Sequence, residues 1–249
     1  MSLVIPPHTP PPEAVTYEDV ARMIDHHLLR PDLTDTQLHD GLQLARAFPI
    51  AAVVVRPCDL DFAVRHLENS LTQVAAAVGF PHGTGTTATK LYEIRDALRR
   101  GAREIDFVLN LGKLFSREFS YVESELLQAA QACREEGARL KVVLESSLLD
   151  DEMKIVAAKL VKRTSADFVV TCTGFASRGF TPRDLEILVW KTTPLAAVKA
   201  VHGIHNLDQL LEARDRGVAR VGTTQTEAIL HAWERRLAER QTPSDPVLS

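Results

Sequence analysis

Residues 195–222, LAAVKAVHGIHNLDQLLEARDRGVARVG, form one complete strand–helix–strand unit. The apolar stretch 195–199 predicts a strand, and 219–222 predicts the next one. Between them, Asn206 can cap the start of a helix and Gly217 can end it in the left-handed conformation. Because a helix separates the two strands, we expect them to lie parallel in one sheet.

The same alternation recurs along the chain. Thr181 followed by Pro182 is a typical helix start, and Gly101 after two arginines is a typical helix end. The candidate strands are 21–25, 50–55, 74–79, 104–109, 140–145, 167–171, 195–199 and 219–222. Eight such units predict an α/β fold, a single-domain (βα)8 TIM barrel; an open doubly wound sheet would need a Gly-rich phosphate turn after an early strand.

Domain boundaries follow from composition. The start, MSLVIPPHTPPPE, holds five prolines, which predicts a flexible arm over residues 1–15. The barrel is expected over 16–240, and QTPSDPVLS predicts a flexible tail over 241–249. The N-terminus lacks the basic start and apolar run of a secretory signal, so we expect a cytoplasmic protein.

Charge and cysteine content exclude several classes of protein. The chain of 249 residues has 29 Lys and Arg against 33 Asp and Glu, a net charge of −4. That balance argues against a nucleic-acid partner, and no apolar run approaches the ~20 residues that cross a membrane. Three widely spaced cysteines, Cys58, Cys133 and Cys172, fit a reducing compartment. A small molecule is the expected partner, and a homodimer is allowed.

The active site of such a barrel lies where its strands end. The residues that close the predicted strands are Asp25-His26, Arg56, Pro81-His82, Asp106, Glu145, Thr171 to Gly174, Lys199 to Gly203 and Gly222 to Thr224.

Successive motifs here resemble those of the 2-deoxyribose-5-phosphate aldolase family, over about residues 17–232. The motifs are IDHHLL, VGFPHG, EIDFVLNLGKL, LKVVLES, DFVVTCTGF, AVKAVHGI and RVGTT. The resemblance implies a class I aldolase, in which a lysine forms a Schiff base with the substrate carbonyl and no metal or other cofactor takes part.

The family's nucleophilic lysine lies in a motif of the form DF-x-K-T-S-T-G, which appears here as DFVVTCTG over 167–174. Val170 occupies the lysine position. A valine side chain has no lone pair and cannot form an imine. The family's usual reaction by its usual route is therefore not expected.

Other parts of the family machinery are present. By resemblance, Asp106 is the carboxylate that moves protons, Lys199 is the lysine whose charge lowers the pKa of the nucleophile, and Lys141 is a second lysine near that centre. Lys199 could itself form the imine if its pKa fell by about three units. Alternatively, these residues are only a retained buried ion network.

Phosphate binding is expected at the ends of the last three strands, where glycine turns and helix N-termini present backbone N–H groups. The family's Gly-Gly-Ile-Arg pattern reads His202-Gly203-Ile204-His205, so both histidines enter the expected site. The remaining candidates are Thr173, Gly174, Gly222, Thr223 and Thr224. These glycines could also simply make tight turns.

Three further interpretations concern polar side chains at the strand ends. Arg56 could hold a carboxylate or phosphate, or form a surface salt bridge. Cys172 could act as a thiolate with His202 or His205, or be a buried inert thiol. The histidines show no diagnostic metal-ligand spacing, so no metal site is predicted.

Two functions remain open. One is a divergent aldolase-like carbon–carbon lyase that acts on a small, phosphorylated or otherwise anionic carbonyl compound, with Lys199 as a substitute amine. The other is a non-catalytic homologue that binds a small anionic metabolite or a partner protein.

Overall fold

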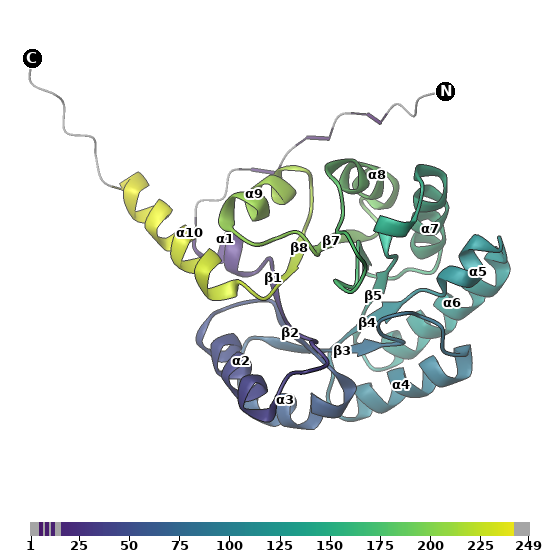
Figure 1. The fold of residues 1–249 in the computed structure, drawn as a ribbon, viewed down its shortest axis with the longest axis horizontal. Helices are drawn as coiled ribbons and strands as arrows, with labels where there is room; N and C mark the ends of the chain where they lie inside the picture. Colours follow the sequence, from purple (N-terminus) through teal and green to yellow (C-terminus); the bar gives the residue numbers. More distant parts are fainter. Residues whose placement is uncertain (1–4, 7, 10, 13–15, 242–249) are drawn as a thin grey trace, which may run out of the picture.

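Eight parallel strands close into a barrel in the computed structural model, which describes residues 5–6, 8–9, 11–12 and 16–241 (Figure 1). Their order around the barrel is their order along the chain, and β8 pairs with β1. The strands are β1 (Ile24–Leu28), β2 (Ala52–Val55), β3 (Gln73–Val78), β4 (Glu104–Val108), β5 (Arg139–Val143), β6 (Phe168–Val170), β7 (Ala197–Val201) and β8 (Arg220–Thr223). This topology confirms the predicted (βα)8 TIM barrel.

Helices surround the barrel (Figure 1). They are α1 (Glu18–Ala21), α2 (Asp35–Ala47), α3 (Leu60–His66), α4 (Thr87–Arg99), α5 (Leu111–Phe115), α6 (Phe119–Glu135), α7 (Asp151–Arg163), α8 (Pro182–Thr192), α9 (Leu207–Asp215) and α10 (Thr226–Gln241), with short 3-10 turns η1 (Pro57–Asp59) and η2 (Ser146–Leu148). Every helix that the structure describes is too short or too polar to traverse a lipid bilayer.

Local signals in the sequence begin and end these helices as expected. Thr181 accepts a hydrogen bond from the backbone N–H of Asp184, and the Asp184 carboxylate accepts one from the backbone N–H of Thr181, which is a complete capping box. Asn206 accepts from the N–H of Gln209 at 3.0 Å and caps α9. Gly217 follows α9 with a φ of 87°, the predicted left-handed end.

The predicted range of the first strand, 21–25, is wrong at both ends. Ala21 ends α1, and the strand runs from Ile24 to Leu28. A short amphipathic helix precedes the strand and buries Val20 and Ala21, and these apolar residues extended the strand pattern toward the N-terminus. The correction matters because it places Asp25 inside the strand instead of at its end.

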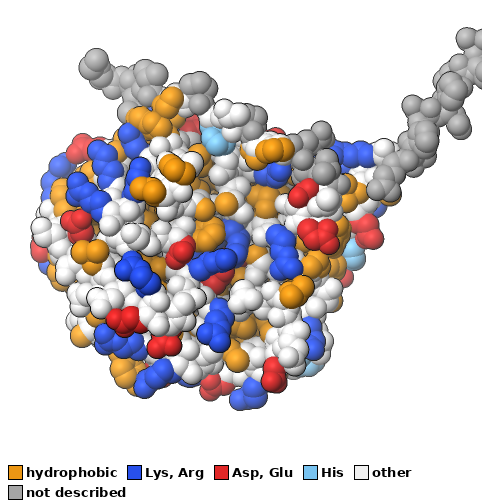
Figure 2. Space-filling model, turned by 180° about the vertical axis from the view of Figure 1, so that it is seen from behind, with side chains coloured by type: hydrophobic (Ala, Val, Ile, Leu, Met, Phe, Trp, Pro, Cys, Tyr) orange, Lys and Arg blue, Asp and Glu red, His pale blue; other side chains and the backbone are white. Residues whose placement is uncertain are grey.

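Most of the predicted arm over 1–15 and tail over 241–249 lies outside the described residues. Of the arm, Ile5, Pro6 and His8 line a groove together with residues of α8, and the carbonyl of Pro12 accepts a hydrogen bond from Arg214 at 2.5 Å. On the face of the molecule shown in Figure 2, acidic and basic side chains are intermixed.

Side chains along each strand alternate between two environments. One set, for example Val53, Ile105 and Phe107, packs against the helices in the main hydrophobic core, where each such side chain contributes about 1.5–3 kcal/mol. The other set points into the barrel. This inner set holds the charged and apolar groups from which the candidate site is built.

Candidate active site

Six charged side chains fill one layer of the barrel interior. They are Asp25, Glu104, Asp106, Lys141, Lys199 and Arg220, and all are buried. Neighbouring strands bring them together because inward-facing residues share a register: Asp106 pairs with Lys141, and Lys199 with Arg220. The three acidic and three basic groups are paired with one another, which offsets the cost of burying charge.

Short ion pairs connect this layer. The Nζ atom of Lys199 lies 2.7 Å from a carboxylate oxygen of Asp25 and 2.7 Å from one of Asp106. Lys141 Nζ contacts Asp25 at 2.7 Å and Glu104 at 2.6 Å. Arg220 completes the layer, 2.8 Å from Asp25. The three predicted catalytic residues, Asp106, Lys199 and Lys141, are therefore brought together.

The charges determine the protonation of the layer. Burial alone would raise the pKa of Asp106, but the positive charges of Lys141 and Lys199 outweigh it and hold the pKa below its usual value. Burial alone would lower the pKa of Lys141, whereas Asp106 and Asp25 raise it above the ordinary lysine value. The network is thus a set of ion pairs, with Asp106 as carboxylate and Lys141 as ammonium.

A layer of valines adjoins the charges. Val170 is 1% exposed and packs with Val108, Val143 and Val201, and Phe80 covers this cluster. Val170 is the register partner of Lys199 across β6 and β7, so its side chain faces the barrel interior. Phe80 in turn contacts Phe175 edge to face, with ring centroids 5.2 Å apart.

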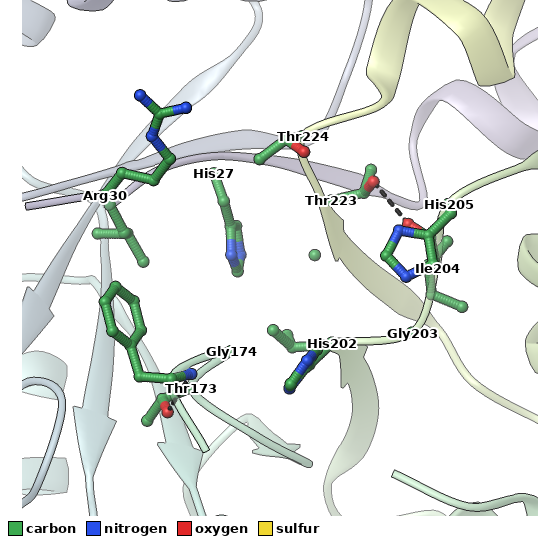
Figure 3. Close-up of a pocket in the computed structure, with 14 residues that line it drawn as sticks. His27, Arg30, Thr173, Gly174, His202, Gly203, Ile204, His205, Thr223 and Thr224 are labelled. Carbon is green, nitrogen blue, oxygen red and sulfur yellow. Dashed lines mark hydrogen bonds between the residues drawn. The ribbon is translucent and has the colours of Figure 1, made fainter. Parts of the chain in front are cut away.

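A pocket of about 330 Å³ opens at the C-terminal ends of the strands (Figure 3). Its lining comes mainly from the loops that follow β1, β6, β7 and β8. The lining residues are His27, Leu29, Arg30, Thr173, Gly174, Phe175, Val201, His202, Gly203, Ile204, His205, Gly222, Thr223 and Thr224. All the predicted phosphate-site residues except Arg56 are among them.

The threonine hydroxyls of the pocket hold its loops. Thr173 donates its hydroxyl to Glu145 at 2.5 Å, and Thr223 donates to the carbonyl of Ile204 at 2.8 Å. In contrast, among the described residues the backbone N–H groups of Gly174, Gly203 and Thr224 donate to no protein acceptor. Three free donors around one cavity can bind an anion.

Arg56 lies elsewhere. Its guanidinium donates to Asp59 at 2.5 Å and to the carbonyls of Arg30, Pro31 and Leu33, so it ties the β1–α2 loop to the end of β2. Arg56 could have bound an anionic ligand or formed a salt bridge, and the structure shows the salt bridge, with Asp59.

Cys172 also lies outside the pocket lining. Its sulfur lies 3.7 Å from the hydroxyl of Ser146, and burial raises the pKa of its thiol to about 11. The geometry therefore fits a buried thiol and not a thiolate beside His202 or His205.

Two histidines that line the cavity each have one buried nitrogen without a hydrogen-bond partner among the described residues. These nitrogens are His27 Nε2 and His202 Nδ1. Burial, together with the nearby charge of Lys199, lowers the pKa of His27 to about 3, so this imidazole is neutral. His205 lies near the pocket mouth, where its backbone N–H donates to Gln209.

Comparison with known proteins gives the family. Residues 20–201 match the model of the DeoC/LacD family aldolases. The chain belongs to this aldolase family. The deoxyribose-phosphate aldolase of Rhodopirellula baltica is 34% identical over 221 residues, which cover 89% of this chain and 92% of the relative. The deoxyribose-phosphate aldolase of Staphylococcus haemolyticus is 36% identical over 214 residues, 86% and 96% of the two chains.

Solved structures agree. QR15, an aldolase, superposes with a TM-score of 0.84 at 29% identity and covers 89% of this chain and 98% of its own. The tetrameric deoxyribose phosphate aldolase from Aeropyrum pernix superposes with a TM-score of 0.81 at 28% identity, covering 88% and 92%. The aldolase-family assignment thus rests on sequence and on fold.

Two residues of this aldolase-family site, His27 and Arg30, were absent from the sequence-based prediction, and both line the pocket. Asp25 was predicted at a strand end and instead joins the charged layer inside the strand. The misplaced first strand explains why His27 was missed. The period of two in a strand that starts at Ile24 places Asp25 and His27 on one face, and that signal could have found both. Among the described residues, no three His, Cys, Asp or Glu side chains gather as metal ligands.

Proposed function

We propose that this aldolase-family chain binds a small phosphorylated carbonyl compound at the C-terminal end of its barrel and forms no imine with it at position 170. The main support for this proposal is the environment of Val170. Its hydrocarbon side chain faces the barrel interior and is packed among three other valines. Where the family motif implies the nucleophilic amine, the site therefore offers no nitrogen.

Anion binding is supported by the other end of the site. Gly174, Gly203 and Thr224, whose N–H groups have no acceptor among the described residues, line the cavity, and Arg30 lines it too, with a guanidinium that extends outward (Figure 3) and donates to Asp32. These groups favour a phosphate over a neutral ligand. The relatives named deoxyribose-phosphate aldolase support the class of phosphorylated carbonyl compound.

A carbon–carbon lyase that uses Lys199 as its amine is the second candidate. Its support is the register, which makes Lys199 the strand neighbour of Val170, with Asp106 beside it as a proton carrier. Against it, Lys199 is fully buried, is absent from the pocket lining and is paired with two carboxylates at 2.7 Å. An amine in this arrangement is not presented to a carbonyl bound in the pocket.

Titration calorimetry with 2-deoxyribose 5-phosphate tests the proposal, with unphosphorylated 2-deoxyribose as the matched control. We expect the phosphate ester to bind, the free sugar to bind much more weakly, and the ester to be recovered uncleaved. Equal affinities would overturn anion recognition, and cleavage of the ester would establish the lyase. A cytoplasmic location and a homodimer remain predictions.

A further inference from the structure

A buried carboxylate supports one wall of the pocket. Glu145 follows β5, is 5% exposed and is absent from the pocket lining. One of its carboxylate oxygens accepts hydrogen bonds from the backbone N–H of Thr173 at 3.0 Å and from the Thr173 hydroxyl at 2.5 Å. The other oxygen accepts from the hydroxyl of Ser147 at 3.0 Å. Glu145 therefore joins the loop after β5 to the loop after β6, which supplies Thr173 and Gly174 to the pocket lining.

The Glu145 side chain takes over where backbone pairing between these two loops ends. The backbone N–H of Ser146 donates to the carbonyl of Thr171 at 2.7 Å, but the N–H of Thr173 donates to the Glu145 carboxylate. Glu145 has a φ of 50°, a left-handed conformation that is uncommon for a residue with a side chain. Such strain persists only where the surrounding contacts maintain it, and it is frequent at functional sites.

These hydrogen bonds determine which N–H groups of the loop after β6 stay available. The N–H of Thr173 is bound to Glu145, and the N–H of Phe175 donates to the Thr173 hydroxyl at 3.1 Å. Between them, the N–H of Gly174 has no protein acceptor among the described residues. Gly174 has a φ of 89°, a conformation that glycine adopts without strain. The arrangement thus reserves the Gly174 N–H for a ligand in the pocket.

We propose that Glu145 is a positioning residue: it holds Thr173 so that the Gly174 N–H is presented to the phosphate of the ligand. This inference rests on the proposed function and deepens it. Glu145 does not itself bind the phosphate, because two anions repel each other and the carboxylate lies outside the pocket lining. Its role depends on oxygen atoms that accept hydrogen bonds and not on its charge.

Glutamine and alanine at this position separate hydrogen bonding from charge. In Glu145→Gln the amide oxygen can accept both bonds from Thr173, and the amide nitrogen can donate to the Ser147 hydroxyl. Titration calorimetry with 2-deoxyribose 5-phosphate should give this variant an affinity within about twofold of the unmodified protein. Glu145→Ala loses both acceptor oxygens and should bind the ester about tenfold more weakly.

The outcomes of this titration separate the two proposals. Full affinity in Glu145→Ala, or a tenfold loss in Glu145→Gln, would overturn the positioning role and leave the proposed anion site intact. If the unmodified protein does not bind the ester, the proposed function and this inference are both wrong.

A matched control distinguishes positioning from a general loss of stability. Thr72 is also buried, directly precedes β3 at the opposite end of the barrel, and donates its hydroxyl to the carbonyl of Ala45 at 3.1 Å. Thr72→Val and Glu145→Ala should both lower the melting temperature, because each loses buried hydrogen bonds. Only Glu145→Ala should weaken binding. The same loss of affinity in Thr72→Val would overturn the inference.

The amide resonance of Gly174 reports on the proposed contact itself. The chain has 12 glycines, so selective ¹⁵N-glycine labelling gives a simple spectrum. At saturating ester, the Gly174 amide proton should shift in the unmodified protein and in Glu145→Gln, because this N–H gains an acceptor. The shift should be much smaller in Glu145→Ala. An equal shift in Glu145→Ala would show that Gly174 reaches the phosphate without Glu145 and would overturn the inference.

Discussion

Val170 and Lys199 are direct neighbours across the parallel β6–β7 pair, and both side chains face the interior of the barrel. A hydrocarbon thus stands beside a buried lysine, at the position where the family motif implies an imine-forming lysine. The Nζ atom of Lys199 lies 2.7 Å from carboxylate oxygens of Asp25 and Asp106. The site keeps the charges that would activate a nucleophile and has no nucleophile beside them.

Val170→Lys should restore imine formation with 2-deoxyribose 5-phosphate. The new amine would lie beside the Lys199 ammonium, and both that charge and burial would lower its pKa. Borohydride reduction followed by peptide mass spectrometry should locate the adduct on residue 170. Crowding of the valine layer should cost about 1–3 kcal/mol of stability. A folded variant without an adduct would show that the surrounding pocket no longer presents the carbonyl correctly.

Lys199→Met should destabilise the barrel strongly. Asp25 and Asp106 would each lose a cation at 2.7 Å and remain buried, and breaking such a pair costs about 3–5 kcal/mol. Urea denaturation measures this loss. As a control, Asp208→Asn breaks an exposed pair with Arg236 and should change the free energy of unfolding by less than about 1 kcal/mol. Similar effects of the two substitutions would contradict the ion-network interpretation.

The two arginines near β1 and β2 should have separable roles. Arg30→Gln removes the cation at the pocket rim and should weaken binding of a phosphate ester about three- to tenfold, with a smaller effect at high salt. Arg56→Gln removes hydrogen bonds within the loops and should lower stability by about 1–3 kcal/mol while the affinity stays the same. Calorimetry and urea denaturation on both variants check this. A large loss of affinity in Arg56→Gln would show that Arg56 contacts the ligand after all.

Stability should fall as the pH drops from 6.5 to 5. Burial lowers the pKa of His26 to about 4, and burial with the Lys199 charge lowers that of His27 to about 3. Below the unfolded value near 6.5, the unfolded chain binds protons that these folded histidines do not, so acid favours unfolding. Each histidine contributes on the order of 1.4 kcal/mol per pH unit in this window.

His26→Gln should remove a large part of that slope, because one of the two most strongly depressed histidines is gone. Urea denaturation at several pH values provides the measurement. The window stops at pH 5 because carboxylates such as Asp25, whose pKa is lowered well below its usual value, begin to contribute in more acidic solution. If His26→Gln leaves the pH dependence of the unfolding free energy unchanged, His26 does not have the lowered pKa assigned to it.

The sequence predicted the barrel because each strand–helix unit carries its own local signals. Asn206, Thr181 and Gly217 act where sequence reasoning places them. The charged layer was partly predicted, through Asp106, Lys141 and Lys199. Local patterns do not specify which side chains meet across the barrel.

The sequence-based predictions that were wrong or missing share one physical cause: they concern contacts between residues far apart in the chain. Arg56 has the right residue type for an anion site, but the carbonyls of the β1–α2 loop occupy its guanidinium. His27 depends on Gly222, almost two hundred residues later in the chain, for the space its ring occupies. Such pairings arise only when the barrel closes.

Borohydride trapping on the unmodified protein shows whether any lysine forms an imine with the sugar phosphate. The chain is incubated with 2-deoxyribose 5-phosphate, reduced, digested and mapped by mass spectrometry. Because Val170 offers no nitrogen and Lys199 is buried between two carboxylates, we predict no adduct on any lysine, under conditions where the Val170→Lys variant is labelled. An adduct on Lys199 would show instead that this lysine is the imine-forming amine.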